Sequence, residues 1–260
     1  MKLRRDGAEI YYEAYGKGPA VVFAHGLGGN HLSWWQQVAH FAPSRTCVVF
    51  AHRGFPPSSP VSGKTAPDSY ADDLAALLQE LDLRDVALVA QSMGGWTCLD
   101  YALRQPNNVR ALVMASTSGK LDFAQLNHSE VNEWAKRAPG ALAELEKRGI
   151  HAAGGERLYR EQPALAQLYT QISQLASPLF RDEVRGRIRE LRKESPSLLA
   201  RLPMPVLFIT GDEDWVFPPA AGPALAKLAP NGSAVRVPAA GHSVYFERAA
   251  KFNELIGRIV

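Results

Sequence analysis

Residues 86–96 read Val86-Ala87-Leu88-Val89-Ala90-Gln91-Ser92-Met93-Gly94-Gly95-Trp96, and this stretch decides the fold. An apolar run stops at a lone serine, and small residues followed by a helical pattern come directly after it. A strand that delivers a nucleophile into a tight turn has this order, because glycines beside the serine leave room for the incoming helix. The motif alone fits a plain strand-to-helix turn equally well, so its meaning depends on the rest of the chain.

The flanking sequence alternates apolar runs of strand length with helical patterns. Continuous apolar runs are typical of strands buried on both faces of a parallel sheet. Helices are expected over 69–81, where Ser69 and Asp72 can cap the start, over 93–104 and 219–228, and at the C-terminus. The alternation predicts an α/β fold with a doubly wound, mostly parallel sheet. Strands are expected at 2–5 and 9–15, joined by a turn at Asp6-Gly7, and at 20–24, 46–51, 86–90, 109–115, 205–210 and 234–237.

The pattern changes between about residue 122 and residue 202. Strand-like runs vanish, and short helical patterns lie between breakers such as Pro139-Gly140 and Pro163. About 80 residues of helix are too many for a simple crossover between strands, so we predict an inserted helical cap. The expected division is a core domain of residues 1–121 and 203–260 with a cap of residues 122–202. Helices that merely extend the core are the alternative.

Polar residues follow four of the predicted strands. His25 and a glycine-rich loop follow the run at 20–24, Ser92 follows 86–90, Asp212 and Asp214 follow 205–210, and His242 follows 234–237. The carboxyl ends of parallel strands share one edge of the sheet, where such folds bind their ligands. A serine needs an imidazole to take its proton, and the imidazole needs a carboxylate to fix its tautomer.

Backbone N–H groups near the serine can supply the oxyanion hole of such a site. The oxyanion of a tetrahedral intermediate needs two donors that already point at it. The N–H of Met93, directly after the serine, is one candidate, and the N–H of Leu27 in the glycine-rich loop is the other.

These motifs resemble those of the α/β-hydrolase fold superfamily, and the likeness covers nearly the whole chain. The motifs are His25-Gly26-Leu27-Gly28, Ser92-Met93-Gly94-Gly95, Gly211-Asp212-Glu213-Asp214 and Gly241-His242-Ser243. The resemblance implies Ser92 as nucleophile, Asp214 as acid and His242 as base, in the family's order. It also implies Leu27 and Met93 as the oxyanion donors.

Two positions depart from the family's usual pattern. Ala90 stands where the elbow usually has glycine, which is expected to crowd the turn slightly. The usual Asp-x-Arg-Gly-x-Gly-x-Ser loop reads Ala51-His52-Arg53-Gly54-Phe55-Pro56-Pro57-Ser58. Its acid is missing, which leaves Arg53 without that carboxylate and puts the loop's shape in doubt.

Several other residues are alternative candidates for the acid or the base, or candidates for the substrate pocket. Asp212 and Asp122 are rivals to Asp214 as the acid. His25 is expected to brace its loop rather than to act as a base, and His52 is expected to be a surface or loop residue. Four side chains are candidates for the wall of a substrate pocket, with ordinary core packing as the alternative: Trp96, Trp134, Trp215 and Val216.

Composition limits the remaining function classes. The chain has 260 residues, 46% hydrophobic and 21% charged, with a net charge of +3. The basic run 181–193 also holds acids, so it is expected to be a solvated helix face and not a nucleic-acid site. The sequence lacks metal-ligand spacings and nucleotide-binding glycine motifs, so no metal and no cofactor is expected.

Two cysteines in apolar contexts, Cys47 and Cys98, predict buried free thiols. The polar start of the chain and the absence of a long apolar run predict a cytoplasmic protein without membrane partners.

The sequence therefore predicts a cofactor-independent serine hydrolase that cleaves an ester or a lactone of a small to medium, partly apolar substrate. A monomer or homodimer is expected. A hydrolase of carbon–carbon bonds in diketones is the alternative within the enzyme class. A non-hydrolytic enzyme or a small-molecule receptor on the same fold is the alternative outside it.

Overall fold

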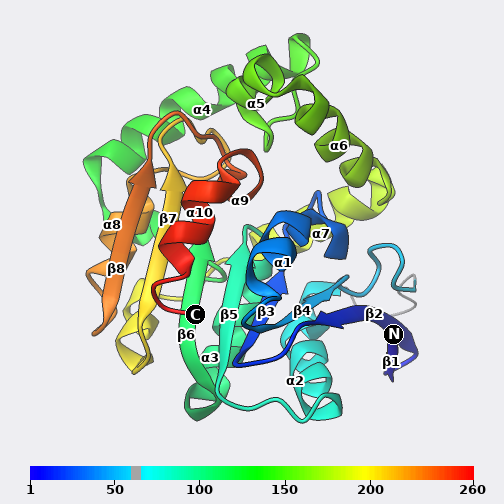
Figure 1. Ribbon diagram of the computed structural model, residues 1–260. Helices are drawn as coiled ribbons and strands as arrows, with labels where there is room; N and C mark the ends of the chain where they lie inside the picture. The colour runs from blue at the N-terminus through cyan, green and yellow to red at the C-terminus, as the bar shows by residue number, and fades with distance from the viewer. Residues whose placement is uncertain (60–65) are drawn as a thin grey trace.

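The computed structural model describes residues 1–59 and 66–260. An eight-stranded sheet with the order β1-β2-β4-β3-β5-β6-β7-β8 forms its centre (Figure 1). Strands β3 to β8 are parallel, and β1 and β2 extend the sheet in antiparallel fashion. The predicted fold class is confirmed. The strands are β1 Lys2–Arg5, β2 Ala8–Tyr15, β3 Ala20–Ala24, β4 Thr46–Phe50, β5 Val86–Gln91, β6 Val109–Ala115, β7 Val206–Gly211 and β8 Gly232–Val237.

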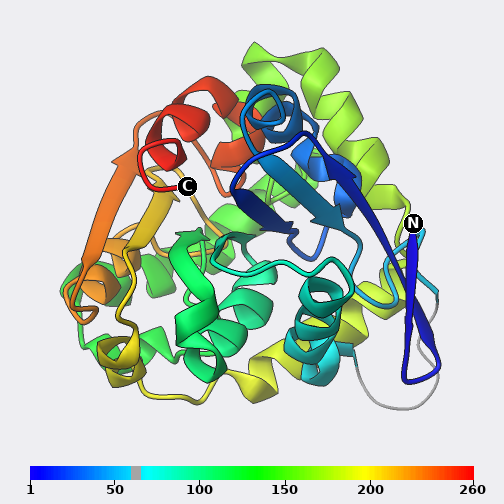
Figure 2. The ribbon, with the colours of Figure 1, turned by 60° about the horizontal axis from the view of Figure 1, so that its bottom comes forward.

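Helices cover both faces of the sheet. Figure 2 shows α1 and α10 on one side of it and α2, α3 and α8 on the other. Each face packs its own cluster of buried apolar side chains, because the strands are apolar on both faces. These helices are α1 Trp35–Phe41, α2 Tyr70–Glu80, α3 Gly94–Arg104, α8 Ala221–Ala226, α9 Val244–Glu247 and α10 Ala249–Ile256. Short 3-10 helices span His31–Trp34, Ala66–Ser69, Pro106–Asn108, Phe123–Leu126 and Pro196–Arg201.

The start of α2 differs from the sequence prediction. Ser69 precedes the helix, but its side chain makes no capping hydrogen bond. Its φ of −106° and ψ of −8° continue the preceding 3-10 turn. A capping serine needs an extended backbone to reach the first free N–H groups, so the predicted cap is wrong.

The cap lies between β6 and β7 and arches over the carboxyl end of the sheet (Figure 1). Its helices are α4 Ser129–Lys147, α5 Gly155–Glu161, α6 Pro163–Gln174 and α7 Pro178–Leu191. The prediction that Pro139-Gly140 ends a helix is wrong, because α4 runs through both residues. Val131, Ala138 and Leu145 are buried along α4, and their packing outweighs the local cost of the proline.

The boundaries of the two predicted domains stay a prediction. The predicted core range 1–121 includes residues 60–65, which lie outside the described residues.

Candidate active site

Ser92 occupies the turn between β5 and α3. Its φ is 49°, a left-handed conformation that costs an L-residue about 1 kcal/mol. The turn is held because the N–H of Ser92 donates to the carbonyl of Ala115, the last residue of β6, at 3.0 Å. Ser92 itself is half-buried and lines a cavity of about 1010 Å³ beneath the cap. The sheet therefore presents this hydroxyl to the cavity.

Small residues let three segments meet around Ser92. A Cβ on Gly94 would lie 2.2 Å from the carbonyl oxygen of Ala24, so only glycine allows α3 to start this close to β3. A Cβ on Gly26 would lie 2.0 Å from Oε1 of Gln91 and 3.2 Å from Cβ of Ser92. The loop after β3 consequently packs directly on the turn.

His242 and Asp214 form a buried pair. His242 Nδ1 lies 2.8 Å from Asp214 Oδ2. The other carboxylate oxygen of Asp214 accepts the N–H groups of Val216 and Phe217 at 2.7 and 2.9 Å. With 1% of Asp214 and 3% of His242 exposed, the pair is shielded from water. The Nδ1–H of His242 donates to the carboxylate of Asp214, which leaves Nε2 as the basic nitrogen.

Ser92 and His242 line the same cavity, and Asp214 lies behind His242. Among the hydrogen bonds of the described residues, none joins Ser92 to the imidazole, a separation that is common in structures without substrate. Leu27 and Met93 also line the cavity. Their backbone N–H groups have no partner among the bonds of residues 1–59 and 66–260, so both can bind a ligand.

The rival acids lie elsewhere. Asp212 is paired with Arg236 at 2.6 Å on the surface. Asp122 caps a 3-10 helix by accepting the N–H of Ala124 at 3.1 Å. The carboxylate that contacts His242 is that of Asp214.

His25 and His52 form a buried network beneath the glycine-rich loop. His25 Nε2 accepts the N–H of His52 at 2.9 Å, so its Nδ1 carries the proton and donates to the carbonyl of Gly26 at 2.8 Å. Burial lowers the pKa of His25 to about 3 and the pKa of His52 well below its usual value. His25 braces its loop, as expected. The surface position considered for His52 is wrong, because His52 is buried and its ring bonds Thr97 at 2.8 Å.

Arg53 finds a carboxylate elsewhere in the chain. Its Nε donates to Asp73 Oδ2 at 2.6 Å and its Nη2 to Asp73 Oδ1. Asp73 lies on α2, and both side chains are buried. The loop after β4 therefore keeps a buried ion pair although the usual acid is replaced by Ala51.

The four predicted pocket residues line the cavity wall: Trp96, Trp134, Trp215 and Val216. Trp134 on α4 also donates its Nε1–H to the backbone carbonyl of Asp214 at 2.8 Å, which joins the cap to the loop of the candidate acid. Sequence reasoning missed four arginines of the cap that line the same cavity, at 181, 185, 189 and 192. The first three are spaced four residues apart and share one face of α7 Pro178–Leu191, a signal that the sequence contains, and Arg192 follows the helix. The solvated face predicted for this run is wrong for Arg181 and Arg192, which are half-buried at the cavity wall.

Within residues 1–59 and 66–260, no group of three or more His, Cys, Asp or Glu side chains is arranged to hold a metal ion. In the same residues, none of the helices is long and apolar enough to span a membrane. Burial makes both cysteines poor ligands and poor nucleophiles. It raises the pKa of Cys47 to about 11 and that of Cys98 further still.

Comparisons with known proteins identify the family of the chain. The family model described as alpha/beta hydrolase fold matches residues 19–249. A non-heme chloroperoxidase of Kitasatospora aureofaciens is 41% identical over 114 residues, which are 43% of this chain and 42% of the relative. The structure of an N-acyl homoserine lactone degrading enzyme superposes with a TM-score of 0.81 and 25% identity over 100% of both chains. A bromoperoxidase from Bacillus anthracis has a TM-score of 0.79 and 26% identity, over 97% of this chain and 95% of that one.

Proposed function

Because the chain belongs to the alpha/beta hydrolase fold family, we propose that it is a serine hydrolase that cleaves a carboxylic ester or a lactone. Ser92 is the nucleophile, His242 the general base and Asp214 the acid that orients His242. The substrate is a small molecule that binds beneath the cap, and no cofactor takes part.

The reaction proceeds through an acyl-enzyme. His242 Nε2 takes the proton of Ser92 as the hydroxyl oxygen attacks the carbonyl carbon, and the N–H groups of Leu27 and Met93 stabilise the oxyanion. The intermediate collapses when His242 returns the proton to the departing alkoxide, which leaves as the alcohol. Water then attacks the acyl-enzyme with His242 again as base, which releases the acid and restores Ser92. Each oxyanion donor contributes about 3 kcal/mol to transition-state stabilisation.

One observation carries the proposal. A serine held in a left-handed turn lines the same cavity as a histidine whose Nδ1 is hydrogen-bonded to a buried carboxylate. Buried imidazole–carboxylate pairs at a cavity wall are what a serine nucleophile needs for activation.

Labelling with a fluorophosphonate, followed by peptide mapping, tests the nucleophile. We expect the folded protein to be modified at Ser92 alone, with a burst of product from a chromogenic short-chain ester. Ser92→Ala should lose the label and lower kcat by about 10⁴-fold or more. A folded wild-type protein whose Ser92 stays unmodified contradicts the proposal. Ser118, a buried serine that hydrogen-bonds its own loop, supplies the matched control as Ser118→Ala, which should keep the label.

A second candidate follows from the bromoperoxidase and chloroperoxidase similarities. Hydrogen peroxide in place of water would open the acyl-enzyme to give a peroxy acid and free Ser92. The peroxy acid would then oxidise bromide to hypobromous acid and be reduced to the carboxylic acid. A bromination assay with acetate and hydrogen peroxide, run on the wild type and on Ser92→Ala, tests it. Bromination that persists in Ser92→Ala would contradict this route.

A further inference from the structure

The cavity wall carries a row of positive charge. Arginines at 181, 185, 189 and 192 line it from α7 and the residue that follows α7. Among the described lining residues, Glu146 is the acidic one. Two histidines and three tyrosines also line the cavity: His151, His242, Tyr159, Tyr169 and Tyr245. Burial lowers the pKa of His151 to about 4, so that it is neutral near pH 7.

Three of these arginines have other interactions or lie in water. Arg181 donates to the carbonyl and the hydroxyl of Ser173 on α6 at 3.1 and 2.8 Å. Arg185 forms an ion pair with Asp182. Arg189 is exposed, so water solvates its charge.

Arg181 also has a buried Nε without a partner, but Arg192 differs in that its whole guanidinium makes no hydrogen bond to the described residues. Its guanidinium lies over the ring of Trp96 at 4.9 Å and over the ring of Phe123 at 5.2 Å. Its Nε is buried without a hydrogen-bond partner, and no ion pair to Arg192 occurs within residues 1–59 and 66–260. Asp122 acts on it only at longer range, since that carboxylate already accepts from Ala124 and Gln125.

A half-buried guanidinium without an anion is unfavourable. Burial lowers the pKa of Arg192 to about 10, so the group still carries its charge at neutral pH. Desolvating a cation that has no hydrogen-bonded counter-ion is unfavourable, and a bound anion offsets this cost. Stacking on aromatic rings fixes the plane of the guanidinium and leaves its edge free for the two oxygens of a carboxylate.

We infer that the substrate carries a carboxylate besides the ester or lactone group, and that Arg192 binds this carboxylate. The inference rests on the proposed function. Arg192 contacts Trp96, and Trp96 lies in the first turn of α3, which follows Ser92 in the chain, so the anion site is close to the nucleophile. The substrate class is the half-ester, or the lactone, of a dicarboxylic acid.

Turnover of matched esters tests this selectivity. The substrates are the para-nitrophenyl half-esters of succinate, glutarate and adipate, each compared with the same ester whose free carboxyl is methylated. We expect the wild type to prefer the carboxylate form of at least one chain length in kcat/KM. Arg192→Met keeps the apolar contact with Trp96 and removes the charge. This variant should lower that preference by about 10- to 100-fold, mainly through KM.

One control lies on α7, and the other is a second substitution at position 192. Arg187 lies on α7, pairs with Asp68 at 2.8 Å and does not line the cavity, so Arg187→Gln should keep the wild-type preference. Arg192→Lys keeps the charge without the planar fork and should retain part of the preference. Two results would overturn the inference and leave the proposed hydrolase activity intact. One is an equal kcat/KM for the charged and the methylated ester of every pair, and the other is an unchanged preference in Arg192→Met.

A binding measurement separates the two proposals if no ester is turned over. Saturation-transfer NMR on Ser92→Ala compares monomethyl glutarate with dimethyl glutarate. We expect saturable binding of the monoanion that is at least about tenfold tighter and is lost in the Ser92→Ala, Arg192→Met double variant. If the monoanion binds in this way and the wild type turns over no ester, the proposed anion site stands and the proposed hydrolase activity is contradicted. Equal binding of the two esters overturns the anion site.

Discussion

Glu247 contacts the loop that carries the candidate base. The N–H of Gly241, which precedes His242, donates to Glu247 Oε1 at 2.7 Å. Glu247 is 3% exposed, and its Oε2 has no partner among the described residues. Burial raises the pKa of Glu247 to about 8, so the carboxyl is largely protonated at neutral pH. A neutral acid therefore supports the loop that carries His242.

This raised pKa predicts how stability changes with pH. Between the usual glutamate pKa near 4.5 and about 8, the folded state binds more protons than the unfolded state, so stability falls as pH rises through this window. Glu247→Gln keeps an acceptor for Gly241 and removes the titration. The melting temperature of the variant relative to the wild type should therefore increase by several degrees from pH 5 to pH 8, measured by calorimetry. A constant difference between the two proteins across this range would contradict the prediction. Glu254→Gln, at an exposed and ion-paired position, is the control and should give that constant difference.

Residues differ in how far the sequence predicts them. Ser92, Asp214 and His242 follow strand ends, and strand ends can be located from apolar runs. Glu247 and Arg192 could not be assigned in this way, because their roles depend on burial and on which charges lie nearby. Both properties are set by elements distant in the chain.

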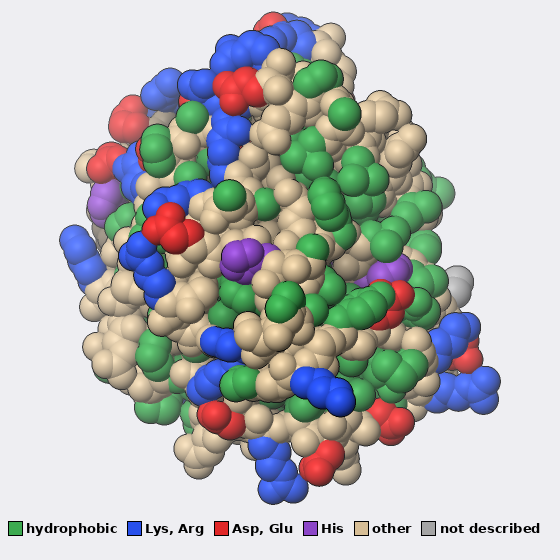
Figure 3. Space-filling model, in the orientation of Figure 1, with side chains coloured by type: hydrophobic (Ala, Val, Ile, Leu, Met, Phe, Trp, Pro, Cys, Tyr) green, Lys and Arg blue, Asp and Glu red, His purple; other side chains and the backbone are tan. Residues whose placement is uncertain are grey.

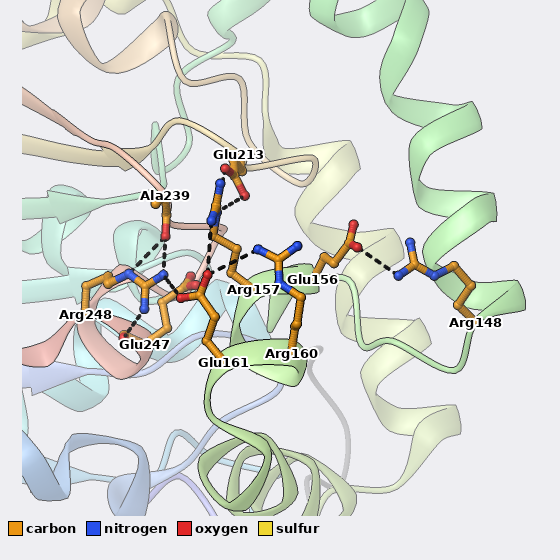
Figure 4. Close-up of polar contacts among 9 residues, drawn as sticks. All are labelled: Arg148, Glu156, Arg157, Arg160, Glu161, Glu213, Ala239, Glu247 and Arg248. Atoms are coloured by element: carbon orange, nitrogen blue, oxygen red, sulfur yellow. Dashed lines mark hydrogen bonds and ion pairs between the residues drawn. The ribbon is translucent and has the colours of Figure 1, made fainter.

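Among the elements, the cap is fastened to the loops of the candidate site by hydrogen bonds and ion pairs. Figure 4 shows Arg157 on α5 pointing at Glu213, and Glu161 lying between Arg157 and Arg248. Arg157 Nε contacts Glu213 at 2.7 Å, and Arg248 Nη2 contacts Glu161 at 2.7 Å and the carbonyl of Ala239 at 2.6 Å. Over α4 and α5, Lys and Arg side chains alternate with acidic ones on the surface (Figure 3). These contacts connect the cap to the loops of Asp214 and His242.

The bond from Trp134 to the carbonyl of Asp214 gives a prediction for α4. Trp134→Phe keeps an aromatic ring at the cavity wall and removes the Nε1–H donor. We expect kcat/KM for a short-chain ester to fall about three- to tenfold, because the lost hydrogen bond is worth about 1 kcal/mol to the docked cap. Steady-state kinetics measures the fall. Trp35→Phe, at an exposed position outside the cavity, should leave kcat/KM unchanged. A Trp134→Phe enzyme with wild-type kinetics would show that this bond does not position the site.

Elements also differ in predictability. The strands were predicted to within one or two residues, since their apolar runs have clear ends. Helix α1 was missed. Its buried positions include Gln37, which donates to the carbonyl of Tyr245 at 2.9 Å and to Asn253 at 3.0 Å. Gln37 is buried because residues distant in the chain accept its hydrogen bonds. A polar residue at a buried position interrupts the apolar pattern by which a helix is recognised in a sequence.

For the molecule as a whole, the sheet separates two apolar layers, and each holds one cysteine. Cys98 lies in the layer under α2, α3 and α8, and Cys47 lies in the layer under α1 and α10. Both are fully buried and unpaired, as predicted.

The two thiols therefore report unfolding of the two layers. Because burial raises the pKa of each thiol and blocks access, we expect neither to react with Ellman's reagent in the native protein. Both should react in guanidinium chloride, over the same denaturant range as the loss of circular dichroism. Cys47→Ala and Cys98→Ala identify which thiol is observed. A thiol that reacts well before the circular dichroism changes would mean that its layer opens independently.

The crowding around Ser92 has a consequence for laboratory evolution. A Cβ at position 94 would collide with the backbone of β3, so random libraries there should return inactive clones. The arginines of α7 at 181, 185 and 189 line the cavity from the cap, whereas Arg192 contacts Trp96 in the first turn of α3. We expect that the three side chains on α7 can be varied while the turn of Ser92 stays intact. A library restricted to positions 181, 185 and 189 should therefore yield new substrate preferences at a higher rate than one spread over the whole chain.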